Sequence, residues 1–160
     1  MEGAREMTYY TVLPRNLMGT VNIYLRDGQY LACPEGKTTA GFRVEIEPAI
    51  ALPDSATPAE LGQSIIELFP HCGGVVEQPN NWGDFTPPIV QRSGVSSWAA
   101  FIKSKPTHVT VDRRVEDFLI ERWRFDGNGF EPTDPRKRWT LDVGASPEKL
   151  GSGITRLLHE

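Results

Sequence analysis

Three histidines are the side chains of this protein best suited to acid–base chemistry, but none stands in a recognisable catalytic or metal-binding pattern. His71 with Asp84 and His108 with Asp112 are pairs in which an imidazole can meet a carboxylate, as general acid–base catalysis requires, yet their spacing is no different from that of ordinary surface residues. The two cysteines form no C-x-x-C pair, and the signatures of nucleophile elbows, zinc peptidases and phosphate-binding loops are missing. The sequence therefore predicts no catalytic residue, no metal site and no cofactor.

Charge is distributed unevenly along the 160 residues. The net charge is −4, but residues 1–90 carry 11 acidic and 5 basic side chains, whereas residues 91–160 carry 10 and 12. Nucleic-acid-binding domains usually have a pI above about 9, whereas this pI is about 5.4. We therefore expect no direct nucleic-acid binding, and the basic triplet at 136–138 is interpreted as a solvated loop. The acidic first half suits a basic protein partner.

The sequence also predicts where the protein works. No apolar run approaches the roughly 20 residues that cross a bilayer, and the N-terminus lacks the apolar core of a secretory signal. We expect a cytoplasmic protein with no membrane contact, in which Cys33 and Cys72 remain reduced.

A sequence repeat indicates the architecture. The stretch SATPAELGQSIIELF (55–69) returns as GASPEKLGSGITRLL (144–158). In each copy Thr57 or Ser146 is an N-cap, a proline occupies the first helical position, and apolar residues recur at helical spacing. Glu60 completes a capping box in the first copy, whereas Lys149 stands at that position in the second.

Strand signals precede each predicted helix. Residues 21–25 alternate apolar and polar, and Asp-Gly at 27–28 predicts a tight hairpin to residues 29–33. Shorter strands follow at 42–47 and 49–52. The second unit has matching strands at 109–111, 118–123 and 139–143, offset by about 88 residues.

These patterns predict one α+β domain over 1–160, built from two duplicated units of hairpin, strand and helix at about 20–70 and about 108–159. One such unit buries too little apolar surface alone, so we expect the two to share a mainly antiparallel sheet with both helices on one face. Gly62 and Gly151 occupy matched positions inside the helices, where glycine costs about 1 kcal/mol relative to alanine. We expect a backbone, from a strand or from the other helix, to approach too closely there for a side chain.

The central segment 71–107 joins the units. Residues 78–85 have loop composition, and Thr-Pro-Pro at 86–88 opens a short turn of helix over Ile89 and Val90. Ser96 or Ser97 caps a second short helix that covers an edge or face of the sheet. Most tryptophans are buried, but Trp82 lies in a polar loop, and tryptophan is enriched at interface hot spots.

The sequence resembles the immunity proteins of bacterial contact-dependent growth inhibition systems over most of residues 20–158. The resemblance rests on the strand VNIYLRDG (21–28), on Ser/Thr-Pro-x-x-Leu-Gly at 57–62 and 146–151, and on a pattern in the central segment. That pattern consists of Trp82, Phe85, Pro88, Val90, Gly94, Val95, Ser97, Trp98 and Phe101.

The resemblance implies a non-enzymatic cytoplasmic protein, monomeric when free, that binds a cognate toxin domain one-to-one and blocks its active site or substrate-binding surface. Many such toxins are nucleases, and a nuclease site is commonly basic, so an acidic inhibitor suits it. The predicted partner-binding residues are the outward carboxylates of the first half and one exposed aromatic residue: Glu45, Glu47, Asp54, Glu67, Glu77, Asp84 and Trp82.

Two alternatives remain open at this stage. One is an enzyme of unknown type that works in a cleft between the two units, which would need three convergent polar groups with shifted ionisation in one deep pocket. The other is a structural or adaptor module that self-associates through a free sheet edge.

Overall fold

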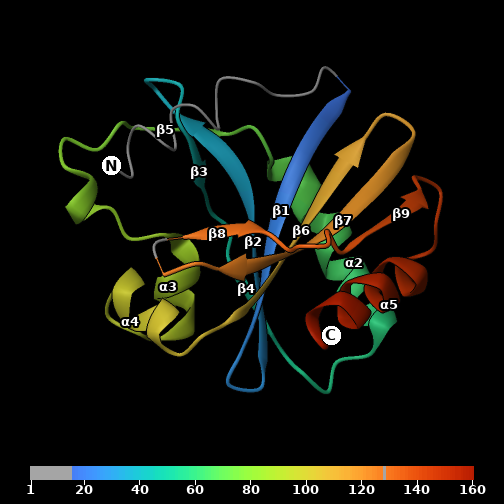
Figure 1. Ribbon diagram of the computed structural model, residues 1–160. Helices are drawn as coiled ribbons and strands as arrows, with labels where there is room; N and C mark the ends of the chain where they lie inside the picture. Colours follow the sequence, from blue (N-terminus) through green and yellow to red (C-terminus); the bar gives the residue numbers. More distant parts are fainter. Residues whose placement is uncertain (1–15, 128) are drawn as a thin grey trace.

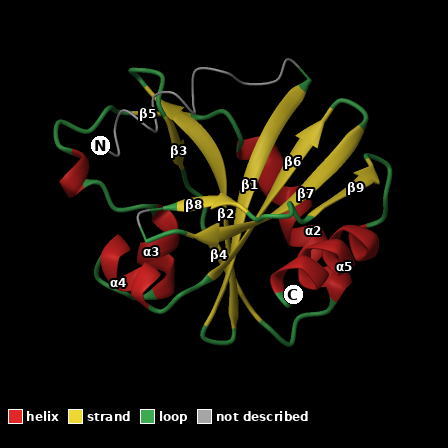
Figure 2. Ribbon diagram, viewed as in Figure 1, coloured by secondary structure: helices red, strands yellow, loops and turns green. Residues whose placement is uncertain are grey.

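Within the residues that the structure describes, nine strands form a curled sheet and four helices pack against it (Figures 1 and 2). The computed structural model describes residues 16–127 and 129–160. The strands are β1 (Leu17–Arg26), β2 (Gln29–Thr38), β3 (Arg43–Glu45), β4 (Ile50–Pro53), β5 (Val75–Val76), β6 (Thr107–Arg114), β7 (Asp117–Phe125), β8 (Phe130–Pro132) and β9 (Arg138–Asp142). The helices are α2 (Pro58–Leu68), α3 (Pro88–Ser93), α4 (Trp98–Lys103) and α5 (Pro147–Leu158), with single 3₁₀ turns η1 (Phe69–His71) and η2 (Trp82–Asp84).

The strand order is β3-β2-β1-β6-β7-β8, with β4 pairing to β2 and β9 to β7. Every pairing is antiparallel except that of β5 with β2. The predicted α+β class and mainly antiparallel sheet are therefore confirmed.

The predicted hairpin joins β1 to β2. Asp27 and Gly28 form its two-residue turn with φ of 47° and 74°, and Arg26 pairs with Gln29. Positive φ at both turn residues matches the right-handed twist of the flanking strands, which is why Asp-Gly is favoured there.

The two halves of the sheet meet where β1 pairs with β6. Val21 pairs with Val111 and Ile23 with Val109, with Asn22 opposite Thr110 at the centre. Val21 and Val109 occupy matched positions of the repeat, as do Ile23 and Val111. The pairing is therefore reciprocal, as across a local two-fold axis between equivalent surfaces.

Helices α2 and α5 lie side by side on one face of the sheet and repeat the same symmetry (Figure 1). A Cβ added to Gly62 would lie 1.8 Å from the carbonyl oxygen of Pro147, and one added to Gly151 would lie 1.7 Å from that of Pro58. The expected close approach is confirmed, and the neighbouring backbone is that of the other helix. Thr57 forms the full capping box of α2, whereas Ser146 caps α5 alone.

Each face of the sheet has its own core. The face under α2 and α5 buries the larger cluster, which includes Val21, Ile23, Leu61, Ile65, Val109, Val111, Ile120, Leu150 and Ile154. The opposite face is covered by α3 and α4, whose buried residues Ile89, Val90 and Phe101 pack against Tyr24, Leu31 and Cys33. The short helices begin at Pro88 and after the cap Ser97, as the sequence predicts. Within the described residues, no helix is long and apolar enough to span a membrane.

Candidate partner-binding surface

Residues 44–91 form an acidic stretch. This stretch contains seven carboxylates and no lysine or arginine, so its formal charge is −7. It runs through β4, α2, η1, β5 and η2 into α3, and it includes all of the predicted partner-binding residues. The seventh carboxylate, Glu60, accepts a hydrogen bond from the Thr57 N–H at 3.1 Å and so serves the cap of α2.

The prediction that Glu45 points outward is wrong. Its Oε2 accepts a hydrogen bond of 2.7 Å from the hydroxyl of Tyr24, and its Oε1 is buried without a hydrogen-bond partner. Burial raises the pKa of Glu45 to about 7, opposed in part by the hydrogen bond from Tyr24. Strand alternation points the Glu45 side chain to one face of the strand and those of Val44 and Ile46 to the other. Both faces are covered by other parts of the protein, so the Glu45 carboxyl lies inside the fold.

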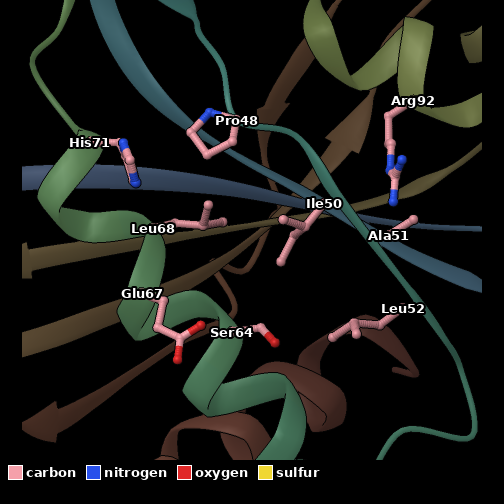
Figure 3. Close-up of a pocket in the computed structure, with 9 residues that line it drawn as sticks. All are labelled: Pro48, Ile50, Ala51, Leu52, Ser64, Glu67, Leu68, His71 and Arg92. Atoms are coloured by element: carbon pink, nitrogen blue, oxygen red, sulfur yellow. The ribbon is translucent and has the colours of Figure 1, made fainter.

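Glu47 and Glu67 line two adjoining open hollows beside β4, of about 280 and 390 Å³, which share Arg92. Figure 3 shows Glu67 and Arg92 on opposite sides of the larger hollow, with Ile50 between them. Gln63 donates a hydrogen bond of 3.1 Å to Glu67 along α2. The larger hollow is lined by Pro48, Ile50, Ala51, Leu52, Ser64, Glu67, Leu68, His71 and Arg92.

This arrangement combines an apolar floor with exposed charges at its rim. Glu67, His71 and Arg92 are exposed, whereas Leu68 is buried and Ile50 half-buried. A side chain with an apolar stem and a charged end fits such a hollow, because the stem can cover the floor while the charge stays at the rim. We call this surface the β4 groove.

Trp82 lies on the outer loop between β5 and α3, and its side chain is held by two other aromatic rings. It is 37% exposed. Its ring meets Phe42 at a centroid distance of 5.7 Å and Phe85 at 5.6 Å, both edge to face. Trp82 is therefore accessible to solvent, and its role in partner binding stays a prediction. We call Phe42, Trp82 and Phe85 the aromatic platform.

The remaining predicted carboxylates are exposed, and they occupy two places. Asp84 belongs to the same 3₁₀ turn as Trp82, and Glu77 follows β5 at the start of that loop. Asp54 lies elsewhere, at the β1–β2 turn, where its N–H donates to the carbonyl of Gly28 at 2.9 Å. The structure thus places Glu47 and Glu67 in two hollows that share Arg92, and Asp84 in the same turn as Trp82, but it does not gather all seven predicted residues into one cluster.

A polar network on the α3/α4 side of the central strands was not predicted. Asn22 donates from Nδ2 to Glu35 at 2.7 Å, so its Oδ1 accepts from His108 Nε2 at 2.9 Å. This pairing assigns the ring proton of His108 to Nε2 and leaves its buried Nδ1 without a partner. Burial lowers the pKa of His108 to about 3, with a further contribution from Arg122.

The network continues across β1 to β3. Glu35 also pairs with Arg43, which donates to the hydroxyl of Thr20 at 3.2 Å. Thr20 in turn donates to Asp112 at 2.7 Å, and burial raises the pKa of that carboxyl. The only sequence signal for these contacts is the polar set of residues on predicted strands, which alone indicates a solvated face.

The groups with large pKa shifts converge around Tyr24, but inside a packed region. The ring of Tyr24 stacks on His108 at 4.3 Å, and burial raises the pKa of both Tyr24 and Cys33 well above their usual values. Neither of the two hollows is lined by any of these groups. Among the described residues no group of three or more histidine, cysteine or carboxylate side chains is arranged to hold a metal ion.

Comparison with known proteins reveals similarity in fold. No protein-family model and no curated protein sequence matches the protein. A protein of unknown function from Neisseria meningitidis, NMB0488, matches with a TM-score of 0.67 at 16% identity, over 92% of this chain and 98% of that one. A chain of the CdiA-CT/CdiI toxin and immunity complex from Yersinia pseudotuberculosis matches with a TM-score of 0.63 at 11% identity, over 88% of this chain and 95% of that one.

Proposed function

We propose that this protein is an immunity protein of a contact-dependent growth inhibition system, which binds a cognate toxin domain in the cytoplasm and neutralises it. The observation that carries the proposal is the fold similarity to a chain of a toxin and immunity complex, which extends over nearly the whole of both chains. The sequence motifs at 21–28, 57–62 and 146–151 support the same assignment. At 11% identity the similarity concerns the fold, so the partner must be inferred from the surface.

The charge of residues 44–91 supports a basic partner. The six exposed carboxylates of this stretch, which has no lysine or arginine, give this part of the surface a negative field, which attracts a positively charged protein and speeds its docking. A toxin domain that cleaves nucleic acid must itself attract phosphate, so its substrate-binding surface is expected to be basic. We propose that the partner is such a nuclease and that the acidic surface covers its active site or substrate-binding surface in a one-to-one complex.

The exposed carboxylates define the proposed binding surface. Glu47 and Glu67 line the two hollows beside β4, and Glu77 and Asp84 belong to the segment between β5 and α3 that carries Trp82; all four are accessible in the free protein. Asp54 is also accessible, at the β1–β2 turn. Glu45 is left out of this surface, because its carboxyl lies inside the fold and is bound to Tyr24.

The proposal predicts a toxin gene directly upstream of the gene for this protein, and expression with the toxin domain encoded there tests it. Cells that produce the toxin domain alone should stop growing, and cells that also produce this protein should grow and yield a stable complex on purification. A matched pair of variants tests the surface: Glu47→Lys with Glu67→Lys should weaken protection, whereas Glu116→Lys with Glu148→Lys, exposed residues of the second half, should retain it. Loss of growth despite full production of the unmodified protein would refute the proposal.

A further inference from the structure

The aromatic platform presents its central ring to solvent in a fixed orientation. Trp82 is the largest of the exposed apolar side chains, and it is supported edge to face by Phe42 from the β2–β3 connection and by Phe85 from its own loop. Such pairs stabilise a ring beyond its buried area. An exposed tryptophan with two supporting rings is the kind of side chain that dominates protein–protein interfaces.

The backbone beneath the platform is also held in place. Asn81 caps the 3₁₀ turn by accepting from the Gly83 N–H at 2.9 Å, and the Phe85 N–H donates to the Trp82 carbonyl at 3.1 Å. The loop is tied to the end of β2 as well, because the Gln78 N–H donates to the Thr39 hydroxyl at 3.0 Å. Little conformational entropy remains to be lost when a partner binds Trp82, which favours affinity.

The charge around the platform selects the partner's side chain. Residues 77–85 contain Glu77 and Asp84 and no lysine or arginine. An indole face attracts a cation through its quadrupole, and neighbouring carboxylates strengthen that attraction. The same carboxylates disfavour an anionic membrane surface or a phosphate-bearing ligand, because like charges repel.

We propose that the aromatic platform is the anchor at which one lysine or arginine side chain of the toxin domain docks, with its cationic group over the face of Trp82 and its charge balanced by Glu77 and Asp84. This inference rests on the proposed function. It assigns a specific contact to a surface that charge alone describes only broadly.

Substitutions of Trp82 test the contact through the dissociation constant of the complex with the purified upstream-encoded toxin domain. Trp82→Ala should weaken binding about 30-fold, as expected for an interface hot spot. Trp82→Phe keeps an aromatic face and should retain most of the affinity, whereas Trp82→Leu keeps only apolar area and should behave like alanine. Met18→Ala, which truncates a side chain 60% exposed on β1, is the matched control and should bind as the unmodified protein does.

The outcomes separate this inference from the proposed function. If the unmodified protein and the Trp82→Ala variant bind the toxin domain with equal, high affinity, Trp82 is not the anchor, and the immunity role still holds. Equal affinities for the leucine and phenylalanine variants would overturn the cationic partner in favour of an apolar one. Absence of binding by the unmodified protein would overturn both. A single cooperative thermal transition for each variant, well above the assay temperature, confirms that folding is intact.

Discussion

Replacement of Gly62 or Gly151 by alanine should destabilise the protein, although glycine-to-alanine changes normally stabilise helices. The new methyl carbon at position 62 would lie 1.8 Å from the carbonyl oxygen of Pro147, where real Cβ contacts do not fall below 3.0 Å. Helices α2 and α5 must therefore part by roughly 1 Å, because the obstacle is backbone and cannot rotate away. The same holds at Gly151 against Pro58, with 1.7 Å.

The magnitude follows from two opposing effects. Overpacking costs about 1–3 kcal/mol and sometimes more, and a backbone obstacle places these sites at the upper end. The higher helix propensity of alanine relative to glycine offsets about 1 kcal/mol of this cost. We expect each variant to lose about 2 kcal/mol in the free energy of unfolding, which corresponds to about 4–8 °C in melting temperature for a protein of this size.

The assay is urea or thermal unfolding of a graded set of variants. In Gly129→Ala the new Cβ has no neighbouring atom within 4 Å, so the stability should change little. In Gly153→Ala the new Cβ lies 2.8 Å from the flexible end of Ile120, so the loss of stability should be intermediate. The double variant of Gly62 and Gly151 should lose less than the sum of the single losses, because both methyl groups part the same two helices. A higher melting temperature for either single variant would refute the close contact of α2 with α5.

The other predictions concern a buried acid and the acidic surface. The pKa of Glu45 is raised to about 7 in the folded protein, so its contribution to stability is full at low pH and is lost as pH rises through about 7. Glu45→Gln mimics the protonated acid, and between pH 5 and 8 its free energy of unfolding should improve relative to the unmodified protein by up to about 3 kcal/mol; parallel stability curves would contradict the buried position. The lowered pKa of His108 makes both proteins less stable as the pH drops below the usual histidine pKa. This effect is the same in both and cancels from the difference between their free energies of unfolding. Reversal of Glu67, Glu77 and Asp84 together to lysine should slow association with the toxin domain and flatten its salt dependence, and unchanged rates at low salt in stopped-flow measurements would remove these residues from the interface.

The elements with strong local signals were predictable from the sequence. The Asp-Gly turn and the cap-and-proline starts of α2 and α5 depend on interactions within a few residues, so the sequence alone specifies them. The start of α4 was predicted to within one residue, because Ser96 and Ser97 are both possible caps and the structure uses Ser97. The paired glycines predicted the close approach of the helices because the sequence repeat has glycine at the matched position of both helices. A glycine in only one of the two helices would not have supported that prediction.

The orientation of the site residues was less predictable, because it depends on contacts between distant segments. Alternation indicates which side chains of a strand share a face, but it does not show whether another segment covers that face. Glu45 and His108 are on strands whose second face is covered, so the Glu45 carboxyl and the His108 ring are enclosed and have shifted pKa values. The β4 groove likewise requires α3, which begins 20 residues after the last residue of α2, to place Arg92 opposite Glu67.

Titration calorimetry of this protein with the purified upstream-encoded toxin domain is the most direct test of the surface-binding role. Binding should saturate at one toxin domain per molecule of this protein, with the toxin's catalytic activity abolished in the saturated complex. Absence of binding heat at several temperatures, with the toxin fully active at a large excess of this protein, would contradict it.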